Sequence, residues 1–504
     1  MTWAALFLWP LVAVVLFKTL RLPVALLVTI IGGYLILPTR TAFDLPLLPS
    51  LDKQTVPVLA ALLGVLLFSG QRQVTATGQT LPPWSVQPGF MPRNKVAFVL
   101  LLIIVFGLIG THMTNADVAI YGYRVLPALR PYDAMSAILS MFLVLLPFFL
   151  ARKVLASRDG QVLLLKALAV AAVAYTFLAL YEIRMSPQIN RMVYGFFQHD
   201  FGQHFRNGGW RPVVFLDHGL QLGIFWTTAV ISAACLVRIT SDKERLIWLL
   251  LMFWLLGVLF LSKVLGAQLI CIAMLGVVFF LPRHLQILAA VFIISCFLIY
   301  PVLRVTNLLP FDLILSNVDP WRAYSLQYRL DNEQLLLEKA NERPLFGWGG
   351  WGRSRVYTDW GDDIATTDGA WVIQLGLSGW VGYIGYFGLM CWGVLSLLWQ
   401  RREGADLVSV ALALALTAMI ADFVPNTNSS PVTWLLAGSL IGRLETVRHR
   451  SAPSEPAAQE DTPPARDIRY AREGSEVVLR SKGLSQSPDR KALPYRREFG
   501  KARP

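Results

Sequence analysis

The stretch AWVIQLGLSGWVGYIGYFGLMCWGVLSLLW (residues 370–399) contains no Asp, Glu, Lys or Arg. An α-helix rises 1.5 Å per residue, so about 20 apolar residues cross the hydrocarbon core of a bilayer. The run is longer than this requirement, and we therefore expect a helix that is tilted or that begins outside the bilayer. Similar apolar runs recur along the chain, and together they decide the fold.

The composition is that of a membrane protein. Of the 504 residues, 55% are hydrophobic and 15% are charged, and the mean hydropathy is +0.53. A soluble domain of this length could not bury so much apolar surface. The sequence therefore predicts an all-α, polytopic integral membrane protein with about 12 or 13 transmembrane helices. The apolar runs lie at 3–17, 22–38, 55–69, 96–111, 134–151, 161–182, 214–237, 246–262, 265–282, 285–303, 370–399, 406–422 and 431–443.

Basic residues predict the orientation of these helices. Every second loop carries Lys or Arg, and the positive-inside rule places such loops in the cytoplasm. The other loops are then external. The basic positions are Lys18, Arg21, Arg72, Arg93, Lys95, Arg152, Lys153, Arg158, Arg238, Lys243, Arg245, Arg283, Arg401 and Arg402, and the external loops are 39–54, 112–133, 183–213, 304–369 and 423–430.

Charge and cysteine usage exclude other classes of protein. The net charge of +13 does not indicate nucleic-acid binding, because much of the excess lies in short loops and in the C-terminal tail. The four cysteines lie in apolar runs without zinc-ligand spacing, and we expect no metal site and no cofactor. We divide the chain into an N-terminal bundle (1–303), a large external loop (304–369), C-terminal transmembrane helices (370–443) and a disordered cytoplasmic tail (451–504).

Arginine is frequent in one predicted external loop. Arg184, Arg191, Arg206 and Arg211 lie within 183–213, against the topological bias. For any one of them, snorkelling or pairing with lipid phosphate is a sufficient explanation. The group as a whole favours a site for an anion such as phosphate or pyrophosphate.

The large external loop is predicted to be partly helical. Leu and Tyr recur at helical spacing from Trp321 to about Ala340, and Pro344 with its following glycines ends the helix. Arg322 and Arg329 are two turns apart and therefore project from nearly the same face. That face presents two guanidinium groups to one diphosphate, or it is a solvated amphipathic surface that pairs with neighbouring acids.

Several segments resemble the superfamily of O-antigen ligases and Wzy-type O-antigen polymerases. They are YRLDNEQLLLEKANERPLFGWGGWG (328–352), DGAWVIQLGLSGWVGYIGYFGL (368–389), RPVVFLDHGLQLGIF (211–225) and LSKVLGA (261–267). In the last, Lys263 occupies the position of the Arg in a Ser-Arg-Gly stretch of the family. The order of these segments along the chain carries the resemblance more than any one of them does.

The resemblance implies a reaction and a location. A glycan carried on undecaprenyl pyrophosphate is transferred to a hydroxyl of an acceptor sugar or lipid-linked acceptor, without a metal. The enzyme would lie in a bacterial inner membrane, with its large loop in the periplasm, beside other polysaccharide-assembly proteins. The polymerase and ligase reactions are both left open.

The expected catalytic base is not a histidine here. The family has a His about eleven residues before a helix glycine that Gly379 matches here, and Asp368 occupies the position of that His. Asp368 is therefore a candidate base. It is alternatively the N-cap of a helix that begins near Ala370. His218 is the second candidate base, and Asp362 and Asp363 are further alternates.

Cations and aromatic residues complete the predicted site. We predict that Arg329 binds the leaving pyrophosphate. The next candidates are Arg211 and Arg322, and after them Arg191 and Lys263. The loop tryptophans either stack on sugar rings or form an interfacial belt, and they are Trp348, Trp351 and Trp360.

Two other functions are weighed against this one. A transporter or flippase of lipid-linked glycans would share an arginine-lined path, but it would carry charges deeper in its helices. A metal-dependent glycosyltransferase of the dolichol-linked type would need an acidic pair in an early external loop. Here that loop offers Asp44 and Asp52, eight positions apart, and we rank this class last.

Overall fold

The computed structural model describes the greater part of the chain, which divides into the units Met1–Ser451 and Ala452–Pro504. In the second unit, the described residues form the strands β7 (Arg472–Glu473) and β8 (Glu476–Val477). Apart from these residues and Ser451, the predicted disordered tail (451–504) lies outside the described residues. Those are 1–44, 49–70, 73–74, 80–81, 84, 86–206, 208–306, 308, 310–317, 320–400, 405–427, 429–451, 472–473 and 476–477.

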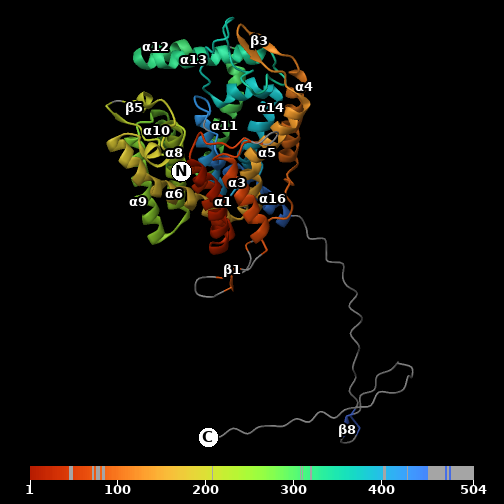
Figure 1. The fold of residues 1–504 in the computed structure, drawn as a ribbon. Helices are drawn as coiled ribbons and strands as arrows, with labels where there is room; N and C mark the ends of the chain where they lie inside the picture. Colours follow the sequence, from red (N-terminus) through yellow and green to blue (C-terminus); the bar gives the residue numbers. More distant parts are fainter. Residues whose placement is uncertain are drawn as a thin grey trace, which may run out of the picture. The chain divides into compact units, whose positions relative to one another are not determined.

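The first unit is a bundle of helices, and each predicted apolar run is a helix in it (Figure 1). Among the described residues, eight helices are long and apolar enough to cross a membrane. The prediction of an all-α polytopic membrane protein is thus confirmed. The helices are α1 (Thr2–Thr19), α2 (Leu22–Ile36), α3 (Thr55–Phe68), α4 (Lys95–Thr114), α5 (Pro131–Val154), α6 (Arg158–Met185), α8 (Gly219–Ile239), α9 (Asp242–Leu261), α10 (Leu265–Phe280), α11 (Arg283–Val305), α14 (Ala370–Leu395), α15 (Leu407–Asp422) and α16 (Pro431–Ser451).

Short elements connect these helices. The predicted loop helix is α13, which runs from Pro320 to Asn341, close to the expected bounds. The strands pair into antiparallel two-stranded hairpins. The elements are α7 (Ile189–Tyr194), α12 (Phe311–Ser316), the 3₁₀ helices η1 (Phe201–His204) and η2 (Ser396–Trp399), and the hairpins β1 (Gln73–Val74) with β2 (Thr80–Leu81), β3 (Ala119–Tyr121) with β4 (Arg124–Leu126), and β5 (Phe205–Arg206) with β6 (Gly209–Trp210).

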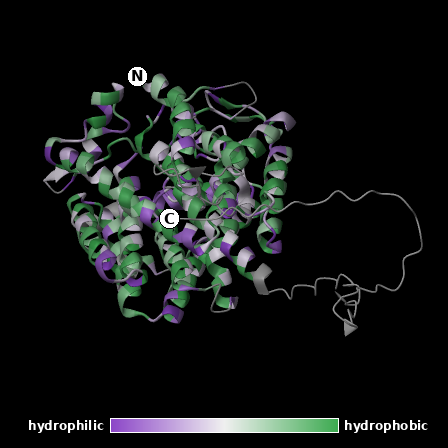
Figure 2. Cartoon of the chain, turned by 90° about the horizontal axis from the view of Figure 1, so that it is seen from below, coloured by the Kyte–Doolittle hydropathy of each residue, from purple (hydrophilic) through white to green (hydrophobic). Residues whose placement is uncertain are grey.

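Burial separates a central helix from peripheral ones. Helix α8 packs against α6, α9, α10 and α15, and 89% of its most apolar window is buried, compared with 17% for α1. The outer helices expose large apolar side chains, such as Leu250 and Phe292. In Figure 2, the green colour of hydrophobic residues accordingly predominates along the helices. Outward-facing apolar side chains are what a lipid-facing surface requires.

The five loops predicted to lie on one side do meet at one end of the bundle, which we call the α13 end (Figure 1). Lys53 Nζ donates a hydrogen bond to Phe215 O at 2.5 Å. Asn115 Nδ2 donates to Gly347 O at 2.9 Å. Such bonds join segments that lie far apart in the sequence. The side of a membrane that this end faces remains a prediction.

Helix α14 is interrupted at Gly379. Gly379 has φ 61° and ψ −167°, which interrupts the helical hydrogen bonds. The turn after α13 fills the gap, because Trp348 N donates to Gly376 O and Trp380 N donates to Pro344 O, both at 2.8 Å. The segments 328–352 and 368–389 of the resemblance thus form one structural unit.

Candidate functional site

Helix α13 carries the first predicted pyrophosphate ligand. Arg329 is half-buried, and its Nη1 donates to Pro425 O at 3.1 Å. The turn 423–426 also accepts hydrogen bonds from Ala370 N, at 3.0 Å, through Phe423 O and Asn426 O. The turn therefore holds Arg329 beside the start of α14. The side chain of Arg322 lies outside the described residues.

A buried carboxylate lies one helical turn from Arg329. Glu333 is 5% exposed, and Arg304 Nε lies 3.6 Å from its Oε2. Tyr300 donates a hydrogen bond to the same oxygen at 3.2 Å. Burial raises the pKa of Glu333 to about 7, although the charges of Arg304 and Arg329 oppose the rise. The sequence analysis missed this residue, because its spacing alone does not reveal that it faces inward.

Asp368 lies next to the turn 423–426 and is half-buried. Two residues before it, Thr366 N donates to Asn332 Oδ1 at 2.7 Å, and Thr366 Oγ1 lies 2.9 Å from the Tyr328 hydroxyl. The alternative that Asp368 caps α14 is wrong: the N-cap is Gly369, with φ 85°, and it makes no side-chain capping bond. Within the described part of the chain, the Asp368 carboxylate has no hydrogen bond or ion pair.

Arg211 brings a second guanidinium to this region. It is half-buried, and its Nη2 lies 3.4 Å from Lys263 O. Burial and the positive charges of Arg206 and Arg329 lower the pKa of Arg211 to about 10, so it remains charged at neutral pH. The structure thus places Arg211 and Arg329, from separate segments, within electrostatic reach of each other.

The remaining predicted cations differ in their placement. Lys263 lies in the tight turn between α9 and α10 with φ 57°, and its ammonium lies against Gly209 in the β5–β6 hairpin. It belongs to the same neighbourhood as Arg211. Arg191 is exposed on the short helix α7, and no hydrogen bond or ion pair joins it to the other candidates among the described residues.

His218 is itself a helix cap. The apolar run was expected to begin at 214, but α8 begins at Gly219, because Glu182 accepts hydrogen bonds from Val213 N and Val214 N at 2.8 Å and holds them in a turn. His218 Nδ1 accepts a hydrogen bond from Leu220 N at 3.0 Å.

His218 also packs against two other histidines, His199 and His204, and we call these three residues the histidine cluster. Burial, His204, His199 and then Arg211 lower the pKa of His218 to about 3. A side chain with so low a pKa is a weak base at neutral pH. The sequence analysis weighed His218 alone, because the spacing of the three residues matches no familiar motif.

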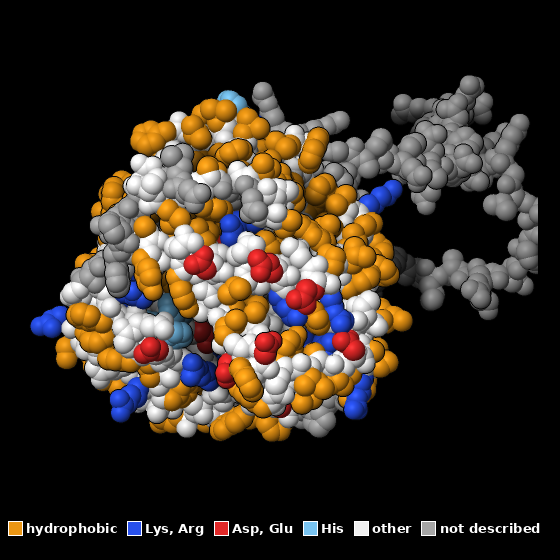
Figure 3. Space-filling view, turned by 90° about the horizontal axis from the view of Figure 1, so that it is seen from above, with side chains coloured by type: hydrophobic (Ala, Val, Ile, Leu, Met, Phe, Trp, Pro, Cys, Tyr) orange, Lys and Arg blue, Asp and Glu red, His pale blue; other side chains and the backbone are white. Residues whose placement is uncertain are grey.

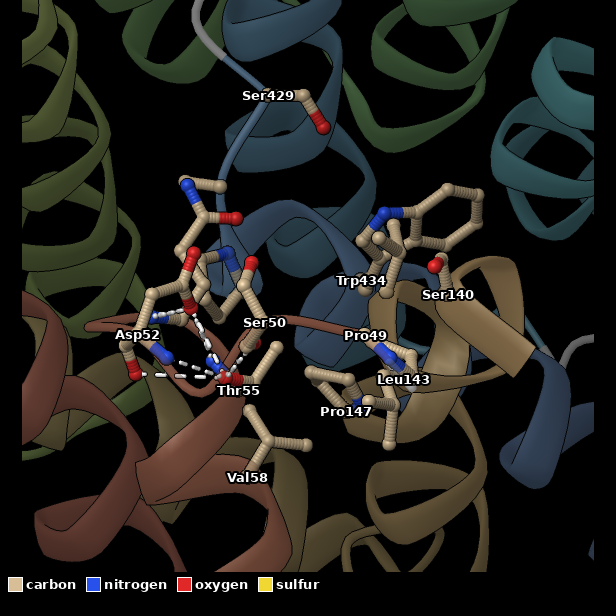
Figure 4. Close-up of a pocket in the computed structure, with 14 residues that line it drawn as sticks. Pro49, Ser50, Asp52, Thr55, Val58, Ser140, Leu143, Pro147, Ser429 and Trp434 are labelled. Atoms are coloured by element: carbon tan, nitrogen blue, oxygen red, sulfur yellow. Dashed lines mark hydrogen bonds between the residues drawn. The ribbon is translucent and has the colours of Figure 1, made fainter. Parts of the chain in front are cut away.

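A cavity of about 160 Å³ opens between α3, α5 and the N-terminal end of α16 (Figure 4). Asp52 and Thr55 line one side, with their hydrogen bonds to each other, and Trp434 and Ser140 line the other. Ser429 extends toward the cavity from the segment that follows the turn 423–426. The hollow is therefore lined by both hydroxyl and apolar groups.

The segment 347–369 is rich in Gly and Trp, and its charges are mainly structural. Arg353 is fully buried and donates to Asp117 O and Pro127 O at 2.9 and 3.0 Å. Trp348 is buried, with Lys339 Nζ 3.7 Å from its ring centroid, so it is not free to stack on a sugar. The other two tryptophans of the prediction are exposed, and they are Trp351 and Trp360.

The sequence matches no protein-family model and no curated protein. The functional argument therefore depends on the geometry of the α13 end and on the segments quoted above.

Proposed function

We propose that this protein transfers a glycan from undecaprenyl pyrophosphate to a hydroxyl of an acceptor sugar, as a ligase or polymerase of lipid-linked polysaccharide. One observation carries the proposal: Arg211 and Arg329 come from separate segments, yet they are close enough for the charge of Arg329 to lower the pKa of Arg211. Two like charges held together in a half-buried place are stabilised by a polyanion that both contact. A pyrophosphate at a bilayer surface has this chemistry.

In the proposed reaction, the acceptor oxygen attacks the anomeric carbon and loses its proton to a base. The bond between that carbon and the pyrophosphate oxygen breaks, and undecaprenyl pyrophosphate leaves with the bonding electrons. Arg211 and Arg329 stabilise the negative charge that develops on the leaving group. The membrane-embedded helices would hold the prenyl chain.

Asp368 is the base in this proposal. Its carboxylate has no partner among the described residues and lies beside the turn that Arg329 contacts. His218 is less suited, because its Nδ1 caps α8 and burial depresses its pKa. We assign Glu333 a positioning role, since its contacts with Arg304 and Tyr300 fix the helix that presents Arg329.

The test uses purified full-length protein in liposomes with an undecaprenyl-pyrophosphate-linked glycan. Release of undecaprenyl pyrophosphate and lengthening of the acceptor are measured together. We expect Arg329→Ala and Asp368→Asn each to lower the rate about 100-fold or more. Arg130→Ala, which alters an exposed arginine that is not among the candidate ligands, is the matched control and should keep the wild-type rate.

Two results would contradict the proposal. The first is full activity of both Arg329→Ala and Arg329→Lys, because then the Arg329 guanidinium does not stabilise the leaving group. The second is movement of the lipid-linked glycan across the bilayer without release of pyrophosphate, which is the signature of a transporter. A reporter fused after Arg353 tests the orientation, and the proposal expects it on the external side.

A further inference from the structure

The histidine cluster brings three imidazoles together at the α13 end. His199 follows α7, His204 ends η1 and His218 precedes α8. The ring centroids of His199 and His204 lie 4.8 and 5.0 Å from that of His218. One ligand nitrogen from each of the three residues lies within 4.8 Å of the others. Figure 3 shows histidine side chains in a hollow of this face, beside basic side chains.

The proposed reaction does not use His204, which is nevertheless completely buried. Neither of its ring nitrogens has a hydrogen-bond partner among the described residues, and the same holds for Nδ1 of His199. A buried polar nitrogen without a partner is destabilising. Two neighbouring rings therefore hold lone pairs or N–H groups that the described protein atoms do not satisfy.

We propose that His199, His204 and His218 bind one divalent transition-metal ion of the Zn²⁺ class. Imidazole nitrogen is a favourable ligand for Zn²⁺, and three protein ligands leave a fourth position for water or an anion. This inference does not rest on the glycan transfer proposed above.

Charged side chains surround the cluster, and metal binds imidazole in its neutral form. The positive charges of Arg211 and Arg206 disfavour a cation bound at the cluster, whereas the negative charge of Asp200 favours one. Because Arg211 adjoins the cluster, an anion at the fourth position would contact both the metal and the guanidinium.

The surrounding loop is held in place by its own hydrogen bonds. Gln198 is buried, and its Nε2 donates to Val214 O and Leu216 O at 2.6 and 3.0 Å. Arg211 N donates to His204 O at 2.8 Å. A backbone fixed in this way brings the histidines together before any ligand arrives.

Binding requires a small rearrangement. Zn–N bonds of 2.0–2.1 Å in a tetrahedral site place ligand nitrogens about 3.4 Å apart, so the rings must approach one another. A neutral His218 ring that accepts from Leu220 N carries its proton on Nε2. Metal binding therefore turns this ring about Cβ–Cγ and replaces the capping bond with a bond to the metal.

The test is a metal titration of the full chain, purified through a tag without histidine, washed with chelator and then given ZnCl₂. Bound zinc is counted by mass spectrometry, and Co²⁺ is substituted to read the coordination from its visible spectrum. We expect about one zinc per chain in the wild type and less than about a tenth of that in His204→Gln and His199→Gln. The wild type should also show a higher melting temperature with zinc than without it.

Matched controls keep the result interpretable. His112→Gln alters a histidine at the same end whose Nδ1 already lies 2.8 Å from Leu108 O, and it should keep the zinc. Arg211→Gln should also keep it, because Arg211 is not a ligand. His199→Gln serves if His204→Gln does not fold, since His199 is less buried. Absence of zinc from the wild type, or its retention in both cluster variants, would overturn the proposal.

Discussion

Glu333 should make the stability of the protein depend on pH. Its pKa rises from 4.5 in the unfolded chain to about 7 in the folded protein, because the carboxyl group is buried. The folded state therefore favours the protonated form. This contribution to stability is complete below pH 4.5 and is lost as the pH rises through 7.

The size of the effect follows from the two pKa values. At 1.36 kcal/mol per unit, the full difference is about 3 kcal/mol, and most of it falls between pH 5 and pH 8. Glu333→Gln removes the titration while it keeps the shape of the side chain. The melting temperature of the wild type should fall by a few degrees more than that of Glu333→Gln over this interval.

The assay is thermal unfolding of the purified protein in detergent, followed by tryptophan fluorescence at pH 5, 6, 7 and 8. Glu338→Gln is the control, because Glu338 is exposed on the same helix and bonds to Gln334. It should follow the wild-type profile. If Glu333→Gln also follows that profile, the reasoning about the buried carboxylate is refuted.

Three further outcomes follow from the structure. Arg353→Ala should destabilise the fold by about 2–4 kcal/mol, because it removes a fully buried guanidinium and leaves its carbonyl acceptors unpaired, whereas Arg355→Ala, at a half-exposed position, should cost about 1 kcal/mol or less. Gly347→Ala should lower the free energy of unfolding by about 2 kcal/mol or more, since φ is 65° and a Cβ would meet the α14 backbone at 2.6 Å. Gly350→Ala is the control, because Gly350 has open space around it. A chain that ends at Ser451 should keep the melting temperature of the full protein, because the helices form a separate compact unit. Thermal unfolding measures all three, and equal losses in each variant and its control would contradict the first two.

The histidine cluster and Glu333 are the features that the sequence pattern alone did not identify. Each is a polar group whose significance depends on what surrounds it. His204 and Glu333 are ordinary residues in the sequence, and only their burial distinguishes them. Asp368 gives the opposite case, since its position suited a helix cap, but the structure places the cap at Gly369.

The sequence by itself determined the helices, their order and the loops that share one end. These follow from local properties: a spanning helix needs an apolar run of sufficient length, and basic residues mark alternate loops. It also located α13 from the spacing of its apolar residues. The roles assigned to Arg329, Arg211 and Asp368 remain predictions.

The tertiary structure decided which charges hold the protein together and which are available to a ligand. Arg353 and Asp117 are 236 positions apart, and their contact removes that arginine from any site. The same packing breaks α14 at Gly379, places Arg211 near Arg329 and gathers the histidines. The physical reason is that burial and electrostatic environment arise from contacts between distant segments, and no local pattern specifies them.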